Sequence, residues 1–86
     1  MDRETIFAAV KTNMRAVIEG VGDKDISENQ SMRDFGADSL EIVEVVSRSM
    51  KQLKIKVPRT QLLDVKNLKE LVDVFERAAV AAATVA

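Results

Sequence analysis

Apolar residues recur at intervals of three and four in three long segments of this 86-residue chain. Such spacing places them on one face of a helix, so each segment predicts an amphipathic helix rather than a strand. Only Pro58 and three glycines interrupt the pattern. The sequence therefore predicts an all-α, four-helix bundle that forms a single domain over 1–86, with its packed core at about 3–77.

Residues that favour helix starts divide the chain into three longer helices and one short one. Asp2 is a suitable N-cap, and the pairs Asp38 with Glu41 and Asn67 with Glu70 have the spacing of a capping box. The expected helices run from Arg3 to Ile18, from Asp38 or Ser39 to about Leu53, from Thr60 to Leu63, and from Asn67 onward.

A long polar connection, 19–37, joins the first two helices. Gly20 and Gly22 are expected to end the first helix, and few sizeable apolar residues follow them. A connection of this length is usually functional or a packed cover. Its expected anchors are Ile26, Met32 and Phe35.

Two further segments have a less regular pattern. Ile55 and Val57 alternate with lysines, but a lone strand would lack a partner, so we expect them to anchor a loop. The Ala-rich residues 78–86 are expected to extend the last helix and then fray, with a docking tail for a partner as the alternative.

Missing residue types exclude several kinds of chemistry. The chain has no His and no Cys, which excludes the usual zinc sites, a thiolate nucleophile, a Ser-His-Asp triad and a disulfide framework. We therefore expect no enzyme activity and no metal site. No apolar run approaches the roughly 20 residues of a membrane span, and the N-terminus lacks a signal-peptide pattern. The expectation is a cytoplasmic monomer without a membrane partner.

Charge is distributed unevenly. Residues 1–46 carry ten acidic and five basic side chains, whereas residues 47–66 carry one acidic and six basic ones. A net charge of −1 and an aromatic content of three Phe argue against a nucleic-acid partner. A solvated face and a helical interaction module that uses residues 48–59 both remain open. The basic residues are Arg48, Lys51, Lys54, Lys56, Arg59 and Lys66.

Ser39 follows Asp38 at the start of the second helix. Backbone N–H groups and the helix dipole favour negative charge there, so a phosphoester on this hydroxyl would be stabilised. An ordinary capping role explains the position equally well, as it does for the other serines. No base in the chain would activate the hydroxyl, so Ser39 would have to be the substrate of another enzyme. The other serines are Ser27, Ser31, Ser47 and Ser49.

The segments Gly36-Ala37-Asp38-Ser39-Leu40 and Ile55-Lys56-Val57-Pro58, with a last helix from Asn67, resemble an acyl carrier protein over about residues 3–77. The resemblance implies that a phosphopantetheinyl transferase esterifies Ser39 with 4'-phosphopantetheine from coenzyme A. The thiol of that arm would carry acyl groups as thioesters. It also implies that Asp38 helps to bind the metal ion of the transferase.

Partner contacts are expected along the second helix. Leu40 and Val43 would be exposed contacts, with Glu41 and Glu44 supplying charge around them, although a core role for Val43 remains open. Typical members of the family continue this helix with acidic residues, and this chain departs from them. The basic residues here, Arg48 and Lys51 among them, favour partners with an acidic surface.

The stretch 44–59 is similar to free-standing carriers of polyketide pathways. In particular it resembles donor carriers of β-branching cassettes, which hold acetyl for a 3-hydroxy-3-methylglutaryl (HMG)-synthase-like enzyme. Acyltransferase and ketosynthase partners are the other expectation, and a carrier for fatty-acid synthesis is the alternative. Asp38 argues against a peptidyl carrier, where His usually precedes the serine.

Overall fold

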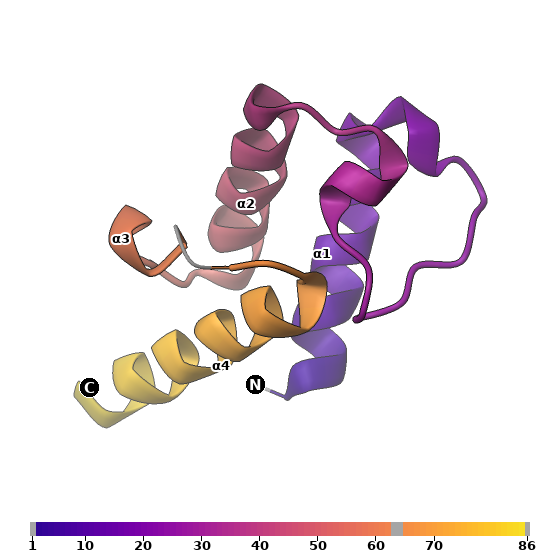
Figure 1. Ribbon diagram of the computed structural model, residues 1–86. Coiled ribbons are helices and arrows are strands. Elements are labelled where there is room, and N and C mark those ends of the chain that lie inside the picture. Colours follow the sequence, from indigo (N-terminus) through magenta and orange to yellow (C-terminus); the bar gives the residue numbers. More distant parts are fainter. Residues whose placement is uncertain (1, 63–64, 86) are drawn as a thin grey trace.

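The computed structural model describes residues 2–62 and 65–85, and within them helices alternate with turns and loops without a strand. The elements are α1 (Arg3–Val17), η1 (Glu19–Val21), η2 (Met32–Phe35), α2 (Ser39–Leu53), α3 (Arg59–Leu62) and α4 (Leu68–Val85), where η marks a 3-10 helix. The predicted all-α fold of three longer helices and one short helix is confirmed (Figure 1).

The helices enclose one core. α1 and α2 run side by side in opposite directions, α4 crosses below them, and the α1–α2 connection covers the other side of α1 (Figure 1). The apolar face of α1 packs into this core, although Phe7 and Val17 are only half-buried. On α4, Leu71, Val72 and Val74 are buried, and Ala79 is half-buried. The largest fully buried apolar side chains are Phe75, Ile6, Met14, Ile18 and Leu68.

The long connection has regular structure of its own. The sequence did not predict η1 and η2, whose side chains Val21, Met32 and Phe35 are buried, while Ile26 is half-buried. The expectation that these residues anchor a packed cover is confirmed. Ile55 and Val57 are likewise buried loop anchors, as predicted.

Three predicted helix bounds shift by one residue, including the start of α4, which begins at Leu68 after its cap Asn67. α1 ends at Val17 instead of Ile18, because Ile18 is its C-cap and donates its N–H to the Met14 carbonyl at 2.8 Å. α3 begins one residue earlier than expected, at Arg59, and the expected last residue, Leu63, lies outside the described part. α4 continues through Val85, as the Ala-rich sequence predicts. None of the described helices is both long and apolar enough to cross a membrane.

The first turn of α4 is capped differently from the prediction. Asn67 Oδ1 accepts a hydrogen bond from the Glu70 N–H at 2.9 Å, as a cap should. Glu70 Oε1, however, accepts from the N–H of Lys66 and not of Asn67, so the reciprocal half of the predicted capping box is wrong. The covering loop supplies further acceptors, because the carbonyl oxygens of Glu28 and Gln30 accept the N–H groups of Lys69 and Leu68.

A buried polar contact joins α1 to α2. The Asn13 amide nitrogen lies 3.2 Å from Ser49 Oγ and 3.1 Å from Gln52 Oε1, and Ser49 donates to the Val45 carbonyl at 2.8 Å. Because buried polar groups are costly unless they are paired, this contact favours one register between the two helices.

Arg3 links the N-terminus to the loop and to α4. Its guanidinium contacts the carboxylates of Asp73, of Glu28 at 3.0 Å and of Glu76 at 3.4 Å. The hydrogen bond with Asp73 raises the pKa of Arg3. Desolvation alone would raise the pKa of Asp73, but the hydrogen bond and charge of Arg3, with Lys69 nearby, outweigh it and lower that pKa. Both groups therefore remain charged at neutral pH.

Candidate functional site: the serine at the start of α2

Ser39 is the first residue of α2, and its side chain is exposed. The predicted capping box before it is complete: Asp38 Oδ1 accepts the Glu41 N–H at 2.8 Å, and Glu41 Oε1 accepts the Asp38 N–H at 3.0 Å. Because these bonds use the backbone and the two acidic side chains, the Ser39 hydroxyl is not needed to cap the helix. The prediction that Asp38 is the cap is therefore confirmed, and the alternative of an ordinary capping role for Ser39 is not what the structure shows.

The preceding turn holds Ser39 at the surface. Gly36 ends η2 with φ +86°, a left-handed conformation that glycine adopts without a steric penalty. Phe35 and Ala37, on either side of this glycine, are buried in the core. Two buried side chains and a tight turn thus fix the backbone from which Ser39 projects.

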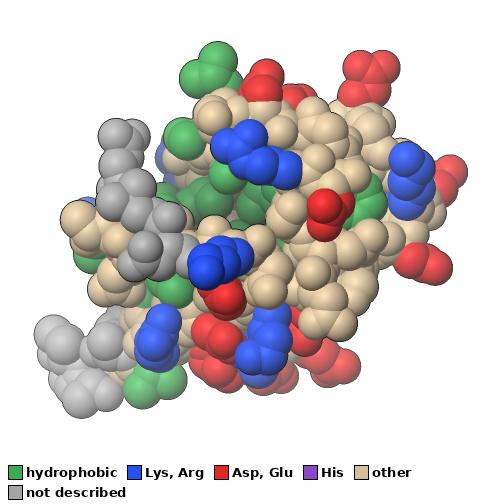
Figure 2. Space-filling model, viewed as in Figure 1, with side chains coloured by type: hydrophobic (Ala, Val, Ile, Leu, Met, Phe, Trp, Pro, Cys, Tyr) green, Lys and Arg blue, Asp and Glu red, His purple; other side chains and the backbone are tan. Residues whose placement is uncertain are grey.

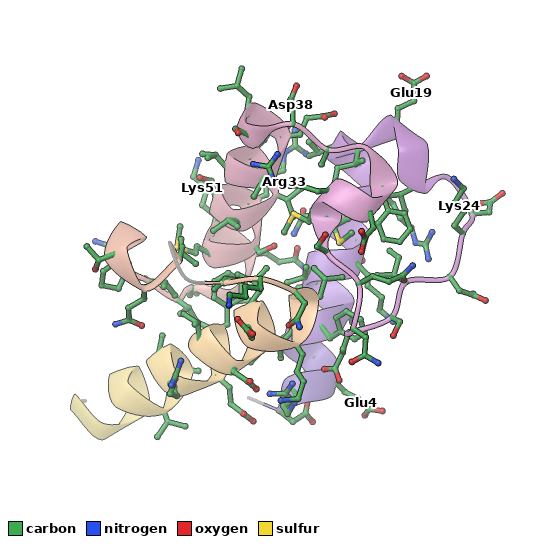
Figure 3. All side chains as sticks on the ribbon, in the orientation of Figure 1. Glu4, Glu19, Lys24, Arg33, Asp38 and Lys51 are labelled. Carbon is green, nitrogen blue, oxygen red and sulfur yellow. The ribbon has the colours of Figure 1, made fainter. Side chains whose placement is uncertain are left out.

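Arg33 of η2 contacts the serine. Its Nη2 atom donates a hydrogen bond to Ser39 Oγ at 3.3 Å. Figure 3 shows Arg33 in the space between η2 and α2. A guanidinium only donates hydrogen bonds and does not deprotonate in proteins, so Arg33 cannot act as a general base on this hydroxyl. The described residues also contain no group of acidic side chains that could hold a metal ion.

An apolar face lies next to Ser39. Leu40 is 81% exposed and Val43 is 51% exposed, so the prediction that both project into solvent is confirmed and the core reading of Val43 is wrong. Figure 2 shows hydrophobic side chains standing out at the top of the molecule, where α2 begins in Figure 1. Whether this face binds a partner remains a prediction.

Charged residues surround this apolar face. Glu41 is half-buried. Glu44 is exposed and pairs with Arg48, whose Nε lies 3.3 Å from the carboxylate. Lys51 is exposed one turn further along α2 (Figure 3). The acidic beginning and the basic end predicted for this helix therefore lie on its solvent side.

A cavity of about 310 Å³ opens between η2, α2 and the start of α4. In Figure 2 a hollow floored by hydrophobic side chains lies between basic side chains. The residues that line the cavity are Ser31, Met32, Arg33, Ile42, Val65, Lys66, Asn67, Leu68 and Leu71. Arg33 therefore belongs both to the rim of this cavity and to the surroundings of Ser39.

Sequence reasoning missed Arg33 and the cavity. One signal for Arg33 was available, because it is the only basic residue between Lys24 and Arg48 in a segment rich in acidic residues. No comparable signal marks the cavity, since its lining comes from three separate segments.

Known proteins resemble this chain in sequence and in fold. Residues 12–75 match the family model described as "Phosphopantetheine attachment site". The polyketide biosynthesis acyl-carrier-protein AcpK of Bacillus subtilis is 31% identical over 75 residues, which cover 87% of this chain and 92% of that protein. Among solved structures, one chain of the complex between the curacin biosynthetic pathway HMG synthase and acetyl donor-ACP matches with a TM-score of 0.79 and 29% sequence identity. This match covers 92% of the present chain and 99% of the other.

Proposed function

Because this chain belongs to the phosphopantetheine attachment site family, we propose that it is an acyl carrier protein whose Ser39 bears the 4'-phosphopantetheine arm. The observation that carries the proposal is the exposed Ser39 hydroxyl, which lies inside the matched range and at the start of α2 but takes no part in the capping box. When bound, the arm supplies a thiol that holds acyl groups as thioesters.

The residues around Ser39 fit this group. In the attachment step, Ser39 Oγ forms a bond to the phosphorus of coenzyme A that bears the pantetheine group. The phosphoanhydride bond breaks, and adenosine 3',5'-bisphosphate leaves. A base of the transferase takes the hydroxyl proton, since this chain supplies none. Asp38 uses its Oδ1 atom in the cap. We propose that its other oxygen reaches the metal ion of the transferase.

Mass spectrometry tests the attachment site. The purified apo-protein is incubated with coenzyme A and a broad-specificity phosphopantetheinyl transferase, and the intact mass and the modified peptide are then measured. We expect one added arm on Ser39, no added mass in Ser39→Ala, and normal loading of the control Ser47→Ala. A folded wild-type protein that stays unmodified would favour the interaction module instead, and a loaded Ser39→Ala would place the arm elsewhere.

Both similar proteins support a polyketide pathway for this carrier. The curated relative is named for polyketide biosynthesis, and the solved neighbour contains an HMG synthase with its acetyl donor-ACP. We therefore propose that this chain donates acetyl to an HMG-synthase-like enzyme during β-branching. The exposed Leu40 and Val43 would form the apolar centre of a small, transient docking surface.

Charge reversal tests the basic end of that surface. Lys51→Glu is expected to weaken binding of acetyl-loaded carrier to the synthase about two- to fivefold at low salt, because it removes one favourable rim charge. Combining it with Arg48→Glu and Lys54→Glu should weaken binding roughly tenfold or more. The measurement is the dissociation constant at low and at high ionic strength, where screening should reduce the difference.

Lys24→Glu is the matched control for Lys51→Glu. It changes the net charge equally, but Lys24 lies on the connection between α1 and α2, away from the exposed side of α2 (Figure 3). We expect its binding to equal that of the wild type. Equal losses for both variants would show that net charge, and not the basic end of α2, controls the encounter.

A further inference from the structure

On the basis of the proposed function, we propose that Arg33 is a positioning residue that pairs with the phosphodiester of the arm on Ser39 and directs the arm toward the cavity between η2, α2 and α4. The starting observation is the hydrogen bond from Arg33 Nη2 to Ser39 Oγ at 3.3 Å. Ser39 Oγ becomes the bridging oxygen of the phosphodiester, so Arg33 already lies next to the position that the phosphate takes.

The backbone of Arg33 is held firmly. Ser31 and Asp34 close a capping box around η2, in which the Ser31 N–H donates to Asp34 Oδ2 at 2.7 Å. Met32 and Phe35, the residues on either end of η2, are buried. The guanidinium therefore extends from a fixed turn, which lowers the conformational cost of holding a ligand.

The local charge favours this pairing. Residues 25–47 contain six acidic side chains and a single basic one, Arg33. A phosphodiester on Ser39 adds another negative charge close to Asp38 and Glu41. The planar guanidinium of Arg33 offsets that charge and matches the oxygens of a phosphate with two parallel donors.

The positions of the basic side chains at the cavity determine the direction of the arm. Arg33 lines the cavity, and so does Lys66 from the segment before α4, so two basic side chains belong to this side of the molecule. Leu40 and Val43 are exposed instead of lining the cavity. Pairing with Arg33 therefore leads the arm away from the proposed docking face and leaves that face free for the partner enzyme.

Paramagnetic NMR on the loaded carrier tests the proposal. Because the chain has no Cys, a thiol-reactive spin label attaches only to the arm. At low salt we expect the label to broaden the amide signals of cavity residues such as Met32, Arg33 and Asn67 in the wild type. Arg33→Gln should lose at least half of this broadening, whereas Arg33→Lys should retain part of it. The matched control Lys24→Gln removes one positive charge on the connection between α1 and α2, outside the cavity lining, and should behave like the wild type.

Each outcome decides a different point. Equal broadening in Arg33→Gln and wild type, or wild-type broadening at Leu40 and Val43 instead, would overturn the role of Arg33 while leaving the attachment to Ser39 intact. An unloaded wild-type protein, seen by intact mass, would overturn the proposed function itself. If Arg33→Gln fails to fold or load, the salt dependence of the wild-type protein tests the ion pair instead. The Debye length is about 3 Å at 1 M salt, so broadening that persists unchanged there contradicts an ion pair between Arg33 and the phosphodiester.

Discussion

Phe75→Ala is expected to remove a large part of the free energy of unfolding of this protein. Phe75 is fully buried on α4, within the core that α1, α2 and α4 share. Truncating a buried Phe costs about 3–5 kcal/mol in lost apolar burial and in the cavity left behind. A domain of this size has a free energy of unfolding of only about 4–13 kcal/mol. Urea denaturation followed by circular dichroism measures the loss.

Phe7→Ala is the matched control for this substitution. Phe7 is only half-buried on α1, with Lys11 Nζ 4.6 Å from the centre of its ring. The same chemical change should therefore cost about 1 kcal/mol, because less apolar surface leaves water and no closed cavity forms. Equal losses at the two positions would contradict the packing of α4 against the core.

Local signals made most of the helices predictable. Asp2 and Asp38 each accept the N–H of the residue three positions later, which depends only on neighbouring sequence. The exposure of Val43 was also predictable from local sequence. The segment that forms α2 has more apolar residues than one buried face requires, so some of them had to face solvent. The start of α4 was harder, because the loop carbonyl oxygens of Glu28 and Gln30 share in its capping.

Contacts between distant segments account for what the sequence did not reveal. Arg3 and Asp73 are 70 positions apart, and no periodicity connects them. Asn13 and Ser49 meet only once α1 and α2 are aligned, although each alone reads as an ordinary polar residue. Arg33 reaches Ser39 because Gly36 reverses the chain between them. The position of Ser39 was therefore predictable, but its surroundings depended on tertiary structure.

Gly20 shows most clearly that contacts between distant segments limit what the sequence alone predicts. The sequence suggested that it simply ends α1, but it lies in η1, where an added Cβ would stand 2.2 Å from the carbonyl oxygen of Phe35 in η2. Backbone atoms cannot yield as a flexible side chain does, so the two turns would have to separate. We expect Gly20→Ala to destabilise the protein by about 2–3 kcal/mol, in the range of overpacked cores.

The comparison with Gly36→Ala separates crowding from backbone strain. Gly36 has φ +86° with open space around its missing Cβ, so alanine there should cost about 1–2 kcal/mol of conformational strain alone.

Gly20→Ala should cost more in thermal denaturation and should also slow loading by the transferase, because Phe35 is only four residues before Ser39. A Gly20→Ala protein as stable as the wild type would mean that η1 and η2 do not pack this closely. Normal loading of a destabilised Gly20→Ala would instead show that the position of Ser39 is set by the capping box of α2 and not by the covering loop.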